Sequence, residues 1–152
     1  MSEDSSIPSL PASHWMGALR QDDRDLLSSY GEFIPAYAGQ AVIREGTEQD
    51  NFYFVVSGKL EVRRGGALGE QVVAYISPGE AMGEVCMFDP GPASATVVPT
   101  EFSQLWRINR DELLSFINDN PGAGAVLLLA TSSILAQRLR TSGHADTHSP
   151  AL

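Results

Sequence analysis

The sequence is poor in the residues that build disulfides and metal sites. It contains one cysteine, Cys86, which excludes a disulfide within the chain and a cysteine-rich zinc site. The three histidines, His14, His144 and His148, lie near the ends of the chain. A metal-dependent β-barrel enzyme carries its ligands on its strands, so these positions indicate solvated histidines rather than a metal centre.

Basic residues are also scarce, and the net charge is −9. Such a surface repels the phosphates of DNA and acidic membranes, so non-specific nucleic-acid binding is not expected. No apolar run approaches the roughly 20 residues that a membrane span needs. The acidic start of the chain, MSEDSSIPSLPASH, lacks the basic and apolar regions of a signal peptide. We therefore expect a soluble, cytoplasmic protein with no membrane partner.

The length and composition fit one globular domain. Of the 152 residues, 43% are hydrophobic and 19% are charged, which favours a folded chain over a disordered one. We expect a flexible leader over residues 1–13, a folded domain over 14–140 and a disordered tail over 141–152. Within the folded part, apolar residues at helical spacing over 14–30 predict one or two short helices.

The middle of the chain consists of short strand-like segments separated by glycine and proline. They are predicted over residues 33–37, 41–44, 52–56, 59–63, 72–76, 95–98 and 102–108. Alternation is clearest where Leu60 and Val62 share one face. This spacing of short strands predicts an antiparallel sandwich or barrel.

Two helices are predicted after the strands. Asn109 suits a helix cap, and Glu112 three residues later completes a capping-box pattern. Asn120 suits the next cap and Pro121 the first helical position. Residues 125–140 then run without a helix breaker.

The last helix is apolar over a wide surface. One stripe and its flanks consist of Leu128, Leu135 and Leu139, with Leu127, Ala130 and Ile134 beside them. A narrow stripe fits packing within the chain, whereas a wide one also fits a second copy of the same helix. Residues 126–139 are therefore interpreted as a homodimer face, with an intramolecular core as the alternative.

Several motifs in register resemble one family. They are GQAVIREG at 39–46, FYFVVSGKLEV at 52–62, PGE at 78–80, GE at 83–84 and SATV at 94–97. Together with the two C-terminal helices, this pattern resembles a cyclic-nucleotide-binding domain of the kind found in catabolite activators and in protein kinase A regulatory subunits. The resemblance spans residues 15–140.

The resemblance implies a mainly β fold with flanking helices. In detail it is an antiparallel β-roll, a jelly-roll-like double-stranded β-helix, with an N-terminal helical segment and two C-terminal helices. It also implies a phosphate-binding cassette, which here comprises Gly83, Glu84, Val85, Cys86, Ala93, Ser94 and Ala95. Glu84 matches the glutamate that accepts a hydrogen bond from the ribose 2′-hydroxyl. Backbone N–H groups after Glu84 would face the cyclic phosphate, with Ser94 beside it.

One position departs from the family. Where the family places an arginine before the SATV run, this sequence has Ala93. Losing one partner of a buried charge pair costs on the order of 3–5 kcal/mol, or roughly a hundredfold to a few thousandfold in affinity. Cyclic AMP and cyclic GMP, the candidate ligands, are therefore expected to bind weakly or not at all. Arg63, Arg64 or a second subunit are alternative sources of charge.

Individual residues retain structural alternatives. Glu84 fits a turn cap as well as a ribose contact. Cys86 between apolar neighbours fits a buried inert thiol better than a reactive one. Thr131, Ser132 and Ser133 fit hydroxyls that bond back to the helix backbone better than contacts to a nucleobase.

Four functions follow from these patterns. The first is a regulatory module that responds to a cyclic nucleotide, and the second is a protein-interaction domain that has lost the ligand. The third is a transcription factor, but only about a dozen residues follow the long helix, which is too few for a helix-turn-helix. The fourth is an enzyme, which is not expected because the sequence shows no nucleophile–base pair, metal cluster or P-loop.

Overall fold

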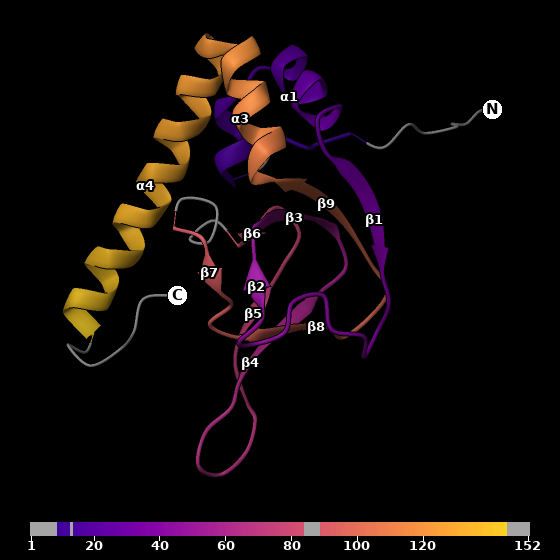
Figure 1. Cartoon of the computed structure of the whole chain (residues 1–152), viewed down its shortest axis with the longest axis vertical. Helices are drawn as coiled ribbons and strands as arrows, with labels where there is room; N and C mark the ends of the chain where they lie inside the picture. The colour runs from indigo at the N-terminus through magenta and orange to yellow at the C-terminus, as the bar shows by residue number, and fades with distance from the viewer. Residues whose placement is uncertain (1–8, 13, 84–88, 146–152) are drawn as a thin grey trace.

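The chain folds into a β-roll that short helices cover at one end and a long C-terminal helix flanks along one side (Figure 1). The computed structural model describes residues 9–12, 14–83 and 89–145. The paired strands it describes are antiparallel. The predicted fold class, an antiparallel β-roll with helices before and after it, is confirmed.

The described elements follow the predicted order of helix, strands and helices. The N-terminal segment forms a 3-10 helix, η1 (His14–Ala18), and helix α1 (Gln21–Ser28). The strands are β1 (Glu32–Ala36), β2 (Glu48–Gln49), β3 (Asn51–Ser57), β4 (Leu60–Arg64), β5 (Gln71–Ile76), β6 (Ala81–Met82), β7 (Gly91–Pro92), β8 (Thr96–Pro99) and β9 (Ser103–Asn109). Helices α3 (Arg110–Asp119) and α4 (Pro121–Ala145) come last. The sheet orders are β1-β9-β3-β6, β2-β7 and β5-β4-β8.

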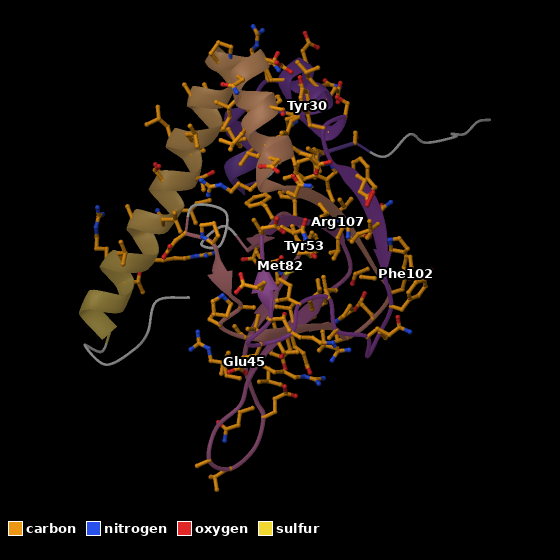
Figure 2. The ribbon with its side chains drawn as sticks, viewed as in Figure 1. Tyr30, Glu45, Tyr53, Met82, Phe102 and Arg107 are labelled. Carbon is orange, nitrogen blue, oxygen red and sulfur yellow. The ribbon has the colours of Figure 1, made fainter. Side chains whose placement is uncertain are left out.

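Strands β3 and β9 separate two hydrophobic clusters. Successive side chains on a strand point to opposite faces. Phe54 of β3 is the register partner of Trp106 of β9, and both side chains pack with the helices at the end of the roll. Tyr53, the residue before Phe54, points the other way and pairs with Met82 of β6 inside the roll (Figure 2). One sheet thus attaches the helices on one face and closes the roll on the other.

The predicted strand over 41–44 is wrong. This segment contributes a single bridge, between Ile43 and Val97, and is otherwise turn-like. Its β-forming residues lie between tight turns, which leave no room for a ladder. The short strands β2, β6 and β7 were not predicted, because two residues each are too few to show a strand period.

The predicted start of the first C-terminal helix is confirmed in atomic detail. The Glu112 N–H donates to the Asn109 side chain at 2.8 Å, and the Asn109 N–H donates to the Glu112 carboxylate at 2.9 Å. This is a complete capping box, which satisfies two helix N-terminal donors. Pro121 opens α4 as predicted.

Both predicted boundaries of the folded domain need correction. Leu10, placed in the leader, is buried among the helices, and the Arg24 side chain donates to its carbonyl at 3.2 Å. Helix α4 continues past Thr141 to Ala145, so the tail does not begin where the sequence suggested. Tertiary packing buries Leu10, which local composition does not reveal.

Helix α4 also corrects the expectation about apolar length. Its segment Pro121–Thr141 is long and apolar enough, by length and composition alone, to cross a membrane. Soluble proteins contain helices that meet the same criterion. In the folded chain α4 packs against α3 and η1, and 17% of the most apolar window is buried.

Candidate ligand-binding site

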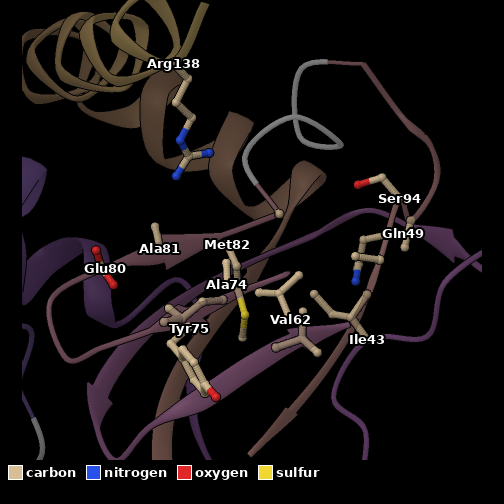
Figure 3. A pocket seen from close by; sticks show the side chains of 15 residues that line it. Ile43, Gln49, Val62, Ala74, Tyr75, Glu80, Ala81, Met82, Ser94 and Arg138 are labelled. Carbon is tan, nitrogen blue, oxygen red and sulfur yellow. The ribbon is translucent and has the colours of Figure 1, made fainter. Parts of the chain in front are cut away.

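A cavity of about 220 Å³ lies between the β-roll and helix α4. Strands β4 and β5 form part of its wall through Val62 and Tyr75, and β6 contributes Met82. Arg138 is directed from α4 toward these strands, and Ser94 lies to one side (Figure 3). A ligand in this cavity would therefore touch both the roll and the long helix.

The cavity collects the described part of the predicted cassette. Gly83, Ala93, Ser94 and Ala95 all line it. Glu84, Val85 and Cys86 lie outside the described residues, so their predicted roles stay predictions. Gly83 has a φ of +87°, and a Cβ atom there would collide with the Asn51 carbonyl. The backbone turn that leads into the cassette therefore requires glycine.

Backbone hydrogen bonds fix the other side of the cassette. The Ala93 N–H donates to the Thr47 carbonyl, and the Gly46 N–H donates to the Ala93 carbonyl, each at 2.8 Å. The adjacent pairing of β2 with β7 continues this contact. Ala93 and its neighbours are thus held at the cavity wall by chain segments far away in sequence.

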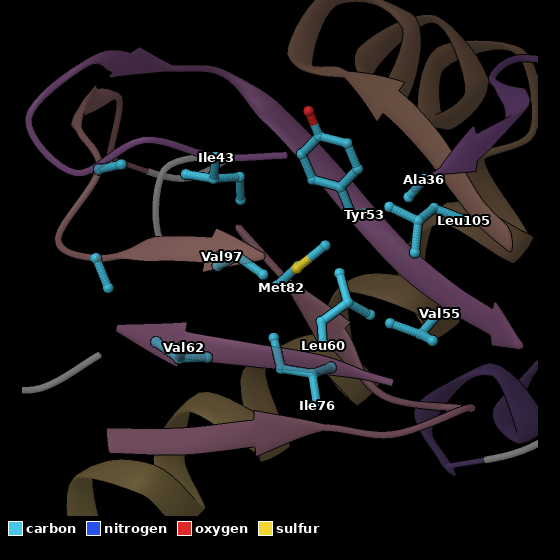
Figure 4. Close-up of a cluster of buried hydrophobic side chains, with 12 residues drawn as sticks. Ala36, Ile43, Tyr53, Val55, Leu60, Val62, Ile76, Met82, Val97 and Leu105 are labelled. Atoms are coloured by element: carbon cyan, nitrogen blue, oxygen red, sulfur yellow. The ribbon is translucent and has the colours of Figure 1, made fainter. Parts of the chain in front are cut away.

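The apolar part of the wall is continuous with the interior of the roll. Val62, Ile76, Met82 and Val97 belong to the buried cluster inside the roll and also line the cavity (Figure 4). Ala93, 7% exposed, belongs to the same cluster. The position at which the resemblance predicts an arginine is therefore occupied by a small apolar side chain at the cavity wall.

Positive charge reaches the cavity from α4, not from the arginines that the sequence suggested. Arg63 pairs with the carboxylates of Glu61 and Glu70, and its hydrogen bond to Glu61 raises its pKa. Arg64 lines a separate hollow in the β4–β5 hairpin. Arg138 is the one cation among the described residues that line the cavity.

Sequence reasoning missed Arg138. It lies near the polar end of α4, and no local pattern distinguishes it from Arg140, which is exposed. Only the packing of α4 along the roll brings its side chain to the cavity.

Two hydroxyl groups of α4 behave as the sequence predicted. The Thr131 hydroxyl donates to the Leu127 carbonyl at 2.8 Å, and the Ser133 hydroxyl donates to the Leu129 carbonyl at 3.0 Å. Both are back-bonded within the helix. Their positions do not put them among the described residues of the cavity wall.

The topology and the cavity define a β-roll domain with a cavity between the roll and the long C-terminal helix. The profile of the cyclic nucleotide-binding domain family matches residues 34–120, which is more than half of the chain. The chain belongs to this family, as the motifs indicated.

Sequence relatives include bacterial regulators and an effector. The chain is 30% identical over 135 residues to the Pycsar effector protein XpPycTIR of Xanthomonas perforans, covering 88% of this chain and 42% of the relative. It is 32% identical over 107 residues to the CRP-like cAMP-activated global transcriptional regulator of Mycobacterium tuberculosis, covering 70% and 46%. The chain thus spans less than half the length of these relatives.

The fold is similar to a solved catabolite activator. The Thermus thermophilus Catabolite Activator Protein superposes with a TM-score of 0.78 at 28% identity, covering 87% of this chain and 61% of the other. The N-terminal domain of a transcriptional regulator from Streptomyces coelicolor A3(2) has a TM-score of 0.74 at 27% identity. Both agree with the predicted β-roll and its flanking helices.

Proposed function

We propose that this domain is a cytoplasmic regulatory module whose cavity takes a cyclic mononucleotide with weak affinity. It acts through binding rather than catalysis. The ligand would enter with its sugar and phosphate toward the cassette. Its charge would be balanced mainly by Arg138, because Ala93 supplies none.

The observation that carries this proposal is the position of Arg138 at the cavity wall. A guanidinium on α4 faces a cassette held on the β-roll, so an anionic ligand would link the two parts. Ligand occupancy would then favour one placement of the helix over others. A difference in affinity between two placements is what a regulatory domain requires.

The weak affinity that we expect follows from the element that carries the charged contact. A cassette arginine sits on the roll beside the phosphate and offers a bidentate fork. Arg138 instead comes from a separate element that the ligand must hold in place, so part of the interaction free energy is spent in ordering the contact. Binding through Arg138 alone is therefore expected to be weaker than binding through a cassette arginine.

Replacing Arg138 tests the proposal. Arg138→Gln keeps a polar side chain of similar reach and removes the charge, so the affinity for cyclic AMP or cyclic GMP is expected to fall about tenfold. Titration calorimetry of the full chain at matched salt measures the change. Arg140→Gln on the same helix makes the same chemical change at an exposed position, and its affinity is expected to stay within about twofold of the unmodified value.

Equal losses in both variants would contradict the proposal, because they would reflect the net charge of the helix and not a contact in the cavity. Unchanged affinity in Arg138→Gln would contradict it as well. Saturable binding that weakens about tenfold in Arg138→Gln and not in Arg140→Gln is the supporting result.

A second candidate function is a protein-interaction module that works without a nucleotide. The burial of Ala93 within the apolar cluster supports it, because an apolar cassette position suits a roll that no longer holds a phosphate. One measurement distinguishes the two candidates. If the domain is an interaction module, titration calorimetry detects no saturable binding of either nucleotide at millimolar concentration.

A further inference from the structure

A buried glutamine faces the cavity from a strand that the sequence did not reveal. Gln49, on β2, is 8% exposed and lines the cavity. The other buried polar residues in the described part of the chain are Ser103 and Thr131. Ser103 bonds to the β3–β4 turn, and Thr131 bonds within its own helix. Gln49 alone of the three lies at the cavity wall.

The hydrogen bonding of Gln49 fixes which end of its amide faces the cavity. Its side-chain oxygen accepts the Asn51 N–H at 2.9 Å. A backbone N–H only donates, so the oxygen and nitrogen of the amide are assigned without ambiguity. None of the described residues accepts a hydrogen bond from the Gln49 amide nitrogen. This NH₂ group therefore has two donors at the wall of the cavity.

The NH₂ group lies at the cassette end of the cavity. Gln49 is the register partner of Gly91, two residues before Ala93. Ala93 is held to the same segment through the carbonyl of Thr47. Gln49 and Ser94 both line the cavity, and Arg138 reaches toward it from α4 (Figure 3). Gln49 thus lines the cavity together with the cassette residues, where Ala93 provides no guanidinium.

We infer that the Gln49 side-chain amide donates a hydrogen bond to the anionic phosphate oxygens of the cyclic mononucleotide. This inference rests on the proposed function and adds a specific contact to it. Gln49 lines the cavity, and its NH₂ group has no acceptor among the described residues, so a ligand oxygen in the cavity would supply one. A neutral amide holds an anion by geometry and contributes no net charge, so Gln49 and Arg138 divide a task that one arginine performs elsewhere.

This division predicts different salt responses. Removing a cation from a site weakens the dependence of binding on salt concentration, whereas removing a neutral donor leaves it unchanged. Arg138→Gln is therefore expected to flatten the plot of affinity against salt. Gln49→Met is expected to lower the whole plot without changing its slope. If Gln49 had only a structural role, Gln49→Met would change neither the level of this plot nor its slope.

The test uses two substitutions at Gln49 in the full chain. Gln49→Met keeps the length and neutrality of the side chain and removes both donors together with the acceptor for Asn51, so cyclic AMP or cyclic GMP is expected to bind about tenfold more weakly. Gln49→Glu keeps the acceptor for Asn51 but replaces the donors with a negative oxygen, so binding is expected to be lost. Glu48→Gln, an exposed change on the same strand, is the matched control and is expected to bind as the unmodified chain does.

The outcomes separate this inference from the proposed function. If the unmodified chain binds a nucleotide and Gln49→Met binds it equally well while remaining folded by circular dichroism, the Gln49 contact is overturned and the proposed function stands. If the unmodified chain binds neither nucleotide at millimolar concentration, both are overturned. Weaker binding by Gln49→Met with an unchanged salt slope supports the contact.

Discussion

Ala93→Arg is expected to strengthen the binding of cyclic AMP or cyclic GMP by at least tenfold. Ala93 lines the cavity beside Ser94, and its backbone is fixed on both sides by hydrogen bonds to Gly46 and Thr47. A guanidinium at this position adds a bidentate, charge-assisted contact to the phosphate. Removing one partner of a buried charge pair costs about 3–5 kcal/mol, and the gain from adding the arginine falls short of this figure because the surrounding segment packs around a methyl group.

The control for this gain is Ala93→Met, which adds bulk of similar length without charge. It is expected to leave the affinity unchanged or lower it, because added volume in a packed wall brings strain. A gain in Ala93→Met equal to that in Ala93→Arg would show that filling space is responsible. No gain in a folded Ala93→Arg protein would show that the cassette no longer has the shape that receives a phosphate.

A double variant that carries Ala93→Arg and Arg138→Gln tests whether the two positions act on the same ligand group. If Arg138 supplies the charge in the natural chain, its loss should matter less once an arginine stands at position 93. The cost of Arg138→Gln is therefore expected to shrink in the Ala93→Arg background, because groups that share a ligand are coupled and their effects do not add. If the effects of Ala93→Arg and Arg138→Gln on the affinity add, the two arginines contact different groups of the ligand.

Leu139→Glu is expected to weaken self-association by roughly a hundredfold or more. We propose that the chain forms a homodimer through α4, since the exposed large hydrophobic residues there include Leu129 at 71% and Leu139 at 63% exposure. Leu128, Leu135 and Leu139 follow seven- and four-residue steps, which suits two helices packed along a seam. Burying a leucine contributes about 1.5–3 kcal/mol, and a dimer loses two copies at once.

The burial pattern favours Leu139 as the test position. Leu127 is 4% exposed and packs within the chain, and Leu128 and Leu135 are half-buried, so changes there also disturb the fold. Leu139 is exposed, so its replacement leaves the domain intact. Leu114→Glu makes the same change at an exposed leucine of α3, away from the proposed seam, and is expected to have no effect on association.

Sedimentation velocity over micromolar concentrations measures the association. The unmodified chain and Leu114→Glu are expected to sediment as dimers, and Leu139→Glu as a monomer with an unchanged circular dichroism spectrum. A monomeric unmodified chain at these concentrations would rule out the α4 dimer.

The sequence was sufficient for the parts of the structure that local rules determine. The capping box at Asn109 and the proline that opens α4 are short-range signals, and both were predicted correctly. The alternation around Leu60 predicted strand β4 in the same way. These features depend on neighbours within a few residues, so they can be predicted from the local sequence without knowledge of tertiary contacts.

The site was only partly predictable because its key groups come from distant segments. Ser94 and Ala95 were found through the family motif. Gln49 was missed because its strand exists only through pairing with β7, and Arg138 was missed because α4 must fold back along the roll to bring it to the cavity. The error at 41–44 has the same origin, since the pairing of this segment with its distant partner stops at the single bridge between Ile43 and Val97.

The central claim is that one ligand contacts both the cassette and helix α4. The most direct measurement is a titration of the ¹⁵N-labelled chain with cyclic AMP and cyclic GMP, followed by amide chemical shifts. The account predicts that the signals of Ser94 and Ala95 and those of α4 around Arg138 shift together with one dissociation constant, while that of exposed Phe102 stays in place. No shift at millimolar nucleotide, or shifts confined to residues away from the cavity, would contradict it.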